Sequence, residues 1–149
     1  MARFVSVDAK TVIGELNHAR ERLRLAGAQA LIAAVRDAED SARNTTTWND
    51  RRALDGTRRT IKGITSVDGF SLKGQLSAGG ASRFLEFGTK AHGPVKAKRL
   101  VFRIGGTLIF AKWVRGITAR KFMREARRVG EQTMDHSVDY FFNRAIHGR

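Results

Sequence analysis

The apolar positions between residues 12 and 38 recur every three or four residues along the chain. They are Val12, Leu16, Ala19, Leu23, Ala26, Ala30, Ala34 and Ala38. This spacing lines one face of an α-helix with apolar side chains. Asp8 is a suitable N-cap residue, and the run 44–47, Asn-Thr-Thr-Thr, is typical of a helix end. The pattern predicts a helix over residues 8–43, of about 35 residues or ~50 Å at the helical rise.

Gly27 lies in the middle of this predicted helix and leaves an alternative open. Glycine costs about 1 kcal/mol relative to alanine inside a helix, so the helix could be broken near this residue. An unbroken helix, in contrast, is too long to bury its whole apolar stripe within one chain of 149 residues. We expect part of an unbroken helix to pack against another subunit.

The middle of the chain predicts two β-hairpins after an exposed connection over residues 44–60. The first hairpin joins residues 61–67 to residues 70–76 through Asp68-Gly69, a dipeptide that favours a type I′ turn. The second joins residues 99–104 to residues 107–114 through Gly105-Gly106. Its alternation places Leu100, Phe102 and Ile104 on one face and Arg99, Val101 and Arg103 on the other. Between the hairpins, residues 81–87 predict a short helix that ends at Gly88.

Helical spacing returns in the last part of the chain and predicts a helix over residues 119–147. The order helix, hairpin, hairpin, helix is typical of an α+β fold. We expect one domain over residues 1–149, with a sheet-forming core over residues 61–114. The two hairpins are predicted to form an antiparallel sheet, and the C-terminal helix is predicted to pack on that sheet.

The composition excludes several classes of protein. Apolar residues make up 42% of the chain and include nine Phe, which is too many for a disordered polycation. The absence of cysteine excludes disulfides, thiolate nucleophiles and cysteine-ligated metal sites. The longest apolar runs fall far short of the roughly 20 residues that span a bilayer. We expect a soluble chain without a secretion signal or a membrane partner.

The net charge of +14 is concentrated in one segment of the chain. Residues 83–128 carry 13 basic and two acidic side chains. Such a concentration attracts polyanions, of which nucleic acid is the commonest. A solvated surface, or an interface with an acidic protein partner, would explain the same charge.

The sequence contains no recognisable catalytic motif. Residues 88–93 include glycines and a lysine but lack the Gly-Lys-Ser/Thr ending of a phosphate-binding loop. The four histidines do not have metal-ligand spacing. Glu86 and His92 are the one pair that could perform acid–base catalysis, but no nucleophile or orienting third group accompanies them. We therefore predict no catalytic, cofactor-binding or metal-binding residue, and no enzyme.

Residues 84–96, Phe-Leu-Glu-Phe-Gly-Thr-Lys-Ala-His-Gly-Pro-Val-Lys, resemble the central signature of a known family. This is the minor tail component family of long-tailed bacteriophages (siphophages), also called neck or tail-completion proteins. In that family an aromatic-rich segment ends in Glu-Phe/Tyr-Gly-Thr and runs into a His/Pro/Lys loop. Residues 56–61, 100–102, 108–114 and 120–126 resemble its neighbouring segments, although Lys121 and Glu125 stand where the family has proline, and Arg58 where it has leucine.

The resemblance implies a structural virion protein at the head–tail junction. Such a protein would form a ring, a hexamer or dodecamer, between the head-closure connector and the tail terminator or tail tube, with a channel for DNA. It would assemble in the host cytoplasm. We expect Gly88 to adopt a positive φ or to permit a close backbone approach, Phe84 and Phe87 to pack the short helix into the core, and Phe122 to anchor the last helix against the sheet. The residues carried by the motif are Phe84, Glu86, Phe87, Gly88, Thr89, His92 and Phe122.

The basic segment supplies the residues expected to face DNA or an acidic partner. They are Lys96, Lys98, Arg99, Arg103, Lys112, Arg115, Arg120, Lys121, Arg124, Arg127 and Arg128. Contacts with DNA would be to phosphates and without sequence preference. The alternative is a free-standing basic protein that binds nucleic acid non-specifically, although the chain has no zinc-finger, helix-turn-helix or RNP-type signature.

Overall fold

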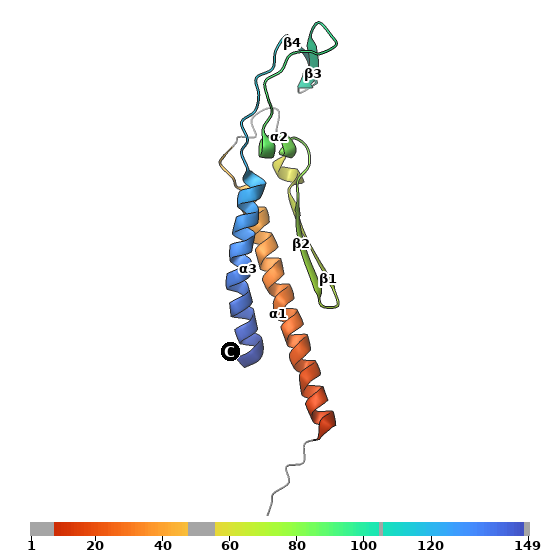
Figure 1. Ribbon diagram of the computed structural model, residues 1–149, viewed down its shortest axis with the longest axis vertical. Coiled ribbons are helices and arrows are strands. Elements are labelled where there is room, and N and C mark those ends of the chain that lie inside the picture. The colour runs from red at the N-terminus through yellow and green to blue at the C-terminus, as the bar shows by residue number, and fades with distance from the viewer. Residues whose placement is uncertain (1–7, 48–55, 105, 148–149) are drawn as a thin grey trace, which may run out of the picture.

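The computed structural model describes residues 8–47, 56–104 and 106–147 and shows an elongated molecule. Helices α1 and α3 lie side by side and antiparallel, hairpin β1–β2 runs along α1, and hairpin β3–β4 lies beyond one end of the helices (Figure 1). The chain is α+β, as predicted. The elements are α1 (Ala9–Arg43), the 3₁₀ turn η1 (Arg58–Thr60), β1 (Lys62–Asp68), β2 (Ser71–Ser77), α2 (Ser82–Phe87), β3 (Leu100–Ile104), β4 (Thr107–Ala111) and α3 (Phe122–His147).

Helix α1 is one unbroken helix of 35 residues, as its apolar spacing predicts. The Asp8 carboxylate accepts hydrogen bonds from the Thr11 hydroxyl (2.8 Å) and the Lys10 N–H (3.1 Å). These bonds hold the pKa of Asp8 below its ordinary value. The alternative of a break near Gly27 is wrong. Gly27 is buried, and a Cβ there would lie 2.9 Å from Leu72 Cδ1, so the glycine serves close packing.

Helices α1 and α3 meet along a seam of small residues. A Cβ on Gly130 would lie 3.0 Å from the Ala38 Cβ and 3.1 Å from the Ala34 carbonyl oxygen. The helices therefore approach so closely that even an alanine at this position would require its neighbours to shift by a few tenths of an ångström. The buried residues of this seam are Ala26, Gly27, Ala30, Ala34, Ala38 and Ala42 on α1, and Phe122, Ala126 and Gly130 on α3.

Hairpin β1–β2 packs on α1 through two glycines. A Cβ on Gly63 would lie 2.5 Å from one methyl carbon of Val35, and a Cβ on Gly74 would lie 2.6 Å from the other. The Gly63 N–H also donates to Glu39 Oε2 at 2.7 Å. The two strands thus straddle the Val35 side chain with their backbones, which fixes their register against the helix.

The turn of this hairpin differs from the prediction by one residue. Asp68 pairs with Ser71, so the two loop residues are Gly69 and Phe70. Only Gly69 has a positive φ, +56°. A type I′ turn needs positive φ at both loop residues, whereas a type II′ turn needs it at the first alone. The geometry therefore fits type II′.

The two hairpins form separate two-stranded sheets, β1–β2 and β3–β4, and α3 packs chiefly on α1. The connection that precedes β1 is also less exposed than predicted. Thr57 is buried, and the Arg58 guanidinium donates to the carbonyl oxygens of Arg43 and Thr45. Residues 48–55 lie outside the described part of the chain.

The largest buried side chains gather where α1 ends and α3 begins. Phe122 is buried there with Ile61 and Leu85, as predicted for Phe122. The prediction for Phe84 and Phe87 is wrong, because these side chains are 52% and 74% exposed. Helix α2 has only six residues, so one side faces inward and Leu85 takes that position. No helix in the described ranges is both long and apolar enough to cross a membrane.

The buried position of Phe122 generates the first prediction. Phe122→Ala should lower the free energy of unfolding by about 3–5 kcal/mol, because truncating a core Phe leaves a cavity. Phe87→Ala is the matched control, and its effect should stay within about 0.5 kcal/mol because the side chain is on the surface. Urea unfolding followed by circular dichroism measures both. Equal losses for the two variants would contradict the core assignment.

The helix seam generates the second prediction. Gly130→Val should destabilise the chain by about 1–3 kcal/mol, because the added carbons overlap Ala34 and Ala38. Gly14→Ala is the control within α1, where a Cβ meets nothing within 4 Å. It should stabilise the chain by up to about 1 kcal/mol through helix propensity. Thermal melts that rank Gly130→Val at or above wild type would rule out the close seam.

Candidate assembly interface

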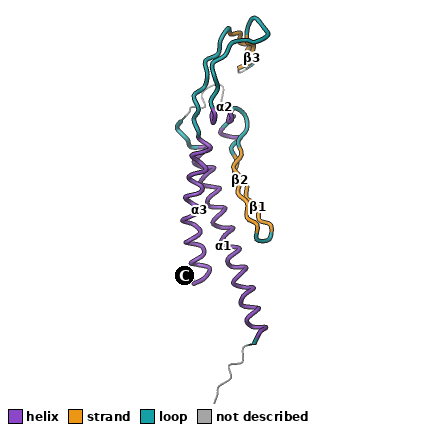
Figure 2. The backbone as a smooth tube through the Cα atoms, in the orientation of Figure 1, coloured by secondary structure: helices purple, strands orange, loops and turns teal. Residues whose placement is uncertain are grey.

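Residues 89–118, here called the arm, leave the body after α2 and return at the start of α3. The arm carries the ribbon β3–β4 at its far end, and two long connections join the ribbon to the body (Figure 2). Figures 1 and 2 both show the ribbon away from α1, α3 and the first hairpin. None of the described residues of the arm is buried.

Glu86 fixes the base of the arm to helix α3. Its carboxylate accepts hydrogen bonds from the backbone N–H of Met123 (Oε2, 2.8 Å) and of Arg124 (Oε1, 3.2 Å). These N–H groups lie in the first turn of α3, where a helix has no internal acceptors. A carboxylate also complements the positive end of the helix dipole. The backbone N–H of Arg120 donates to the Leu85 carbonyl at 2.7 Å and strengthens the same junction.

Gly88 and Thr89 join the start of the arm to its end. Gly88 has φ +73°, as predicted, and a Cβ there would lie 2.6 Å from the Ile117 carbonyl oxygen. The Thr89 N–H donates to that same oxygen at 2.8 Å. In return, the Ile117 N–H donates to the Thr89 carbonyl (3.1 Å) and to its hydroxyl oxygen (3.0 Å). Gly88 permits the close approach of the two ends of the arm, and the hydrogen bonds between Thr89 and Ile117 stabilise it.

His92 forms the next rung along the arm. Its backbone pairs with Val114 through two hydrogen bonds, of 3.1 and 2.9 Å. Its Nδ1 lies 3.2 Å from the Lys90 carbonyl oxygen. Glu86 and His92, the pair considered for acid–base chemistry, are thus both engaged in holding the arm.

Lys121 has an unusual backbone conformation at the entry to α3. It is the one described residue other than glycine with a positive φ, +53°. Proline is locked near φ −65° and cannot adopt this conformation. A proline at position 121 therefore could not adopt the backbone conformation by which this chain enters α3.

The eleven basic residues singled out in the sequence are all exposed, and they form two groups. Arg127 pairs with Glu131 (2.7 Å), and Arg128 pairs with Glu125 (2.5 Å), which lowers the pKa of Glu125. Between residues 87 and 124 the chain has ten basic residues and no acidic one. The first group, on the arm, is Lys96, Lys98, Arg99, Arg103, Lys112 and Arg115. The second, at the start of α3, is Arg120, Lys121, Arg124, Arg127 and Arg128.

One face of the ribbon is apolar and exposed. Val101 pairs with Phe110, and Leu108 lies next to Phe110 on the same face. These three side chains are 56%, 59% and 51% exposed. A two-stranded ribbon is marginally stable by itself in water. An apolar face on such a ribbon therefore needs a covering surface.

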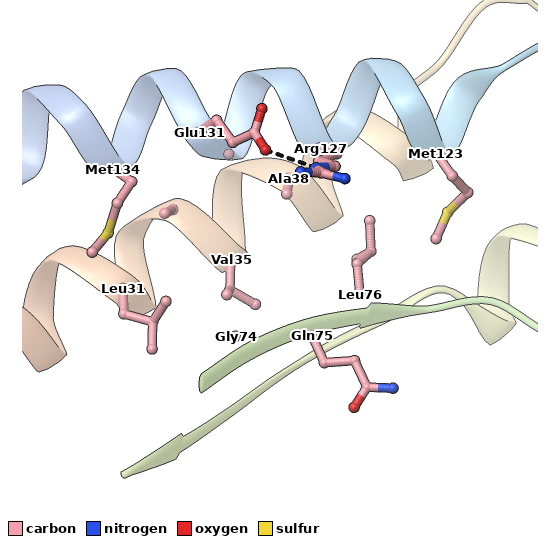
Figure 3. A pocket seen from close by; sticks show the side chains of 12 residues that line it. Leu31, Val35, Ala38, Gly74, Gln75, Leu76, Met123, Arg127, Glu131 and Met134 are labelled. Carbon is pink, nitrogen blue, oxygen red and sulfur yellow. Dashed lines mark hydrogen bonds and ion pairs between the residues drawn. The ribbon is translucent and has the colours of Figure 1, made fainter. Parts of the chain in front are cut away.

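The body carries an open apolar groove of about 530 Å³ between α1, β2 and α3. Met123 and Met134 reach into it from α3, while Leu31 and Val35 approach from α1 (Figure 3). Leu76 closes it on the side of β2. The Arg127–Glu131 ion pair lies at its rim.

A second open groove, of about 520 Å³, lies near the tip of the first hairpin. Leu16 and Leu23 of α1, Phe70 and Leu72 of the hairpin and Phe142 of α3 line it. Leu16 is 64% exposed, so the apolar stripe of α1 continues uncovered beyond the body. The grooves and the ribbon together leave a large apolar surface in contact with water.

Neither groove was predictable from local sequence patterns, because each is built from three elements far apart in the chain. The one available signal was the pair Met123 and Met134, eleven residues apart and so on one helix face. Methionine is common where an apolar surface must adapt to a partner.

The part of the chain that the structure describes contains no group of three His, Asp or Glu residues placed to hold a metal ion. No known protein family, curated protein or solved structure matches the chain. The function must therefore be argued from the geometry and from the motif at residues 84–96.

The cap that Glu86 places on α3 generates the third prediction. Glu86→Ala should lower the free energy of unfolding by about 0.5–2 kcal/mol, the usual cost of losing a helix cap. Glu131→Ala is the matched control, because that carboxylate lies away from the helix ends and makes only an exposed pair with Arg127. Thermal melts of the two variants compare the losses. If Glu131→Ala costs as much as Glu86→Ala, the anchoring role of Glu86 is wrong.

Proposed function

We propose that this chain is a structural protein of the bacteriophage head–tail junction, a neck or tail-completion protein. It assembles in the host cytoplasm as a ring of identical copies between the connector and the tail, with a channel for DNA. The observation that carries the proposal is the structural role of the motif at residues 84–96, which resembles the family's signature. Glu86, Gly88, Thr89 and His92 all serve to anchor a projecting arm to the body.

The distribution of apolar surface supports a role in assembly. Monomeric soluble proteins seldom expose large contiguous apolar patches, and such patches usually mark interaction sites. This chain exposes apolar side chains on the ribbon, on α2 and along the start of α1. A closed ring offers each copy two neighbours, which can cover two such surfaces at once.

The basic arm supports contact with DNA as a polyanion. Seven of the ten basic residues between positions 87 and 124 lie on the arm. A ring would repeat them around its axis, where they would attract phosphates without reading bases. No reaction is required of such a ring, and we propose no catalytic role.

A free-standing nucleic-acid-binding protein is the second candidate function, and the same basic arm favours it. The apolar face of Val101, Leu108 and Phe110 argues against this second function, because contacts with phosphates need charged and polar groups. A protein of this kind would leave that face in water when it binds DNA.

The fourth prediction distinguishes the two functions by the molar mass of the particles that the protein forms in solution after nuclease has removed bound nucleic acid. Light scattering should give a ring-sized species at low and high salt, because burial of apolar surface is not screened by ions. Negative-stain electron microscopy should show closed rings with a central hole. A monomer that binds duplex DNA, loses it steeply with added salt and never assembles would favour the nucleic-acid-binding protein instead.

A further inference from the structure

We infer that a hollow between α2 and the first turns of α3 binds the phosphate backbone of DNA. This inference rests on the proposed function, because it names a surface on the body of each copy that touches the DNA in the channel. The hollow is separate from the ribbon at the far end of the arm, and Arg83, one of its lining residues, was not among the basic residues singled out in the sequence.

Three arginines from two elements line this hollow. It is open to solvent and has a volume of about 510 Å³. Arg83 belongs to α2, whereas Arg124 and Arg127 belong to α3. Arg124 and Arg127 are three residues apart, which places them on the same face of the helix. Arginine presents a planar set of N–H donors that can hold two oxygens of one phosphate, so these side chains suit a phosphate backbone.

Two of the three guanidinium groups are available to a ligand. The side chains of Arg83 and Arg124 make no hydrogen bond or ion pair within the described part of the chain, and both residues are exposed. Arg127 pairs with Glu131, but its side chain is 79% exposed. An ion pair in such a position contributes little to stability, so Arg127 can also turn to a phosphate.

Glu86 is the one acidic side chain in the described lining of the hollow. Its two carboxylate oxygens already accept hydrogen bonds from the backbone N–H groups of Met123 and Arg124. The positive end of the α3 dipole offsets part of its charge. Ala78, Phe87 and Met123 add apolar surface to the walls. A hollow with an excess of one sign of charge and apolar walls concentrates its field on a ligand of the opposite sign.

The positive charge continues from the hollow toward the arm. The backbone N–H groups of Arg120 and Lys121 donate to the carbonyl oxygens of Leu85 (2.7 Å) and Glu86 (3.4 Å), so this part of the chain lies against the end of α2. The side chains of Arg120 and Lys121 are exposed. A strip of positive charge matches a ligand that repeats its negative charge, and duplex DNA carries one charge roughly every 1.7 Å along its axis.

The fifth prediction tests the hollow by removing its two unpaired arginines. The double variant Arg83→Ala, Arg124→Ala should bind random-sequence duplex DNA about tenfold or more weakly at low salt. The slope of log Kd against log salt concentration should fall by about 2, because each lost phosphate contact lowers it by about 1. Fluorescence anisotropy of labelled duplex DNA over a salt series, with nuclease-treated full-length protein, measures both quantities.

The matched control carries Arg22→Ala and Arg128→Ala. It makes the same change of net charge at exposed positions outside the lining of the hollow. Its salt slope should equal that of wild type, because neither side chain touches a phosphate in this account. Thermal melts should show that both double variants fold. A control as impaired as the hollow variant, or a hollow variant that binds DNA like wild type, would overturn the phosphate site.

Cross-linking to DNA locates the contact directly. A photo-reactive phenylalanine analogue at position 87, which lines the hollow, should link to duplex DNA. The same analogue at position 142, in the groove near the tip of the first hairpin, should not. Rings that link to DNA from position 110 of the ribbon and not from position 87 would overturn this inference and leave the proposed function standing.

Two further outcomes separate the hollow from the ring. A hollow variant that keeps its affinity for DNA but no longer assembles would assign the hollow to a protein partner and overturn the inference. A chain that stays monomeric and links to DNA from position 87 would support the phosphate site and overturn the proposed ring.

Discussion

The close contact between α1 and α3 is the interaction on which the rest of the structure depends. Gly130 lies against Ala34 and Ala38, and no larger side chain could take its place without moving the helices apart. The seam joins the two long helices through small side chains, which bury little apolar area per residue. The helix pair is therefore narrow, and the larger apolar side chains of the chain are not buried between the helices.

The hairpin and the arm show two outcomes of that constraint. The backbone of hairpin β1–β2 packs on α1, because Gly63 and Gly74 let it close around Val35, although Ile64, Val67 and Phe70 are still 42–53% exposed. The ribbon β3–β4 does not pack on the helices, although Glu86 and Thr89 hold the base of its arm firmly. A well-anchored arm that ends in an uncovered apolar ribbon supports the proposed contact with another molecule. In that proposal, the basic residues around the ribbon would favour an acidic or phosphate-bearing surface.

The features that could be predicted from the sequence are those that depend on residues close to one another in the chain. The limits of α1, the helical end at Asn44 and the positive φ of Gly88 all follow from local spacing and from residue type. The turn of the first hairpin lies one residue later than predicted, because Gly69-Phe70, with glycine first, suits a type II′ turn whereas the prediction took Asp68-Gly69 for a type I′ turn. Phe84 and Phe87 were assigned to the core because their side chains are apolar, whereas α2 is too short to turn more than one side inward. The separation of the hairpins into two sheets and both grooves depend on contacts between distant segments, which no local pattern reports.

The central claim is that the apolar face of the β3–β4 ribbon is exposed to water in the single chain and buried against another copy in the proposed assembly. Hydrogen–deuterium exchange of the full chain, measured over a dilution series that spans assembly, tests it most directly. The account predicts that the backbone N–H groups of β3 and β4 exchange fast in the dilute chain and slowly in the assembled one, while those of the α1–α3 seam are protected in both. Ribbon exchange that is the same at every concentration, with assembly taking place, would contradict it.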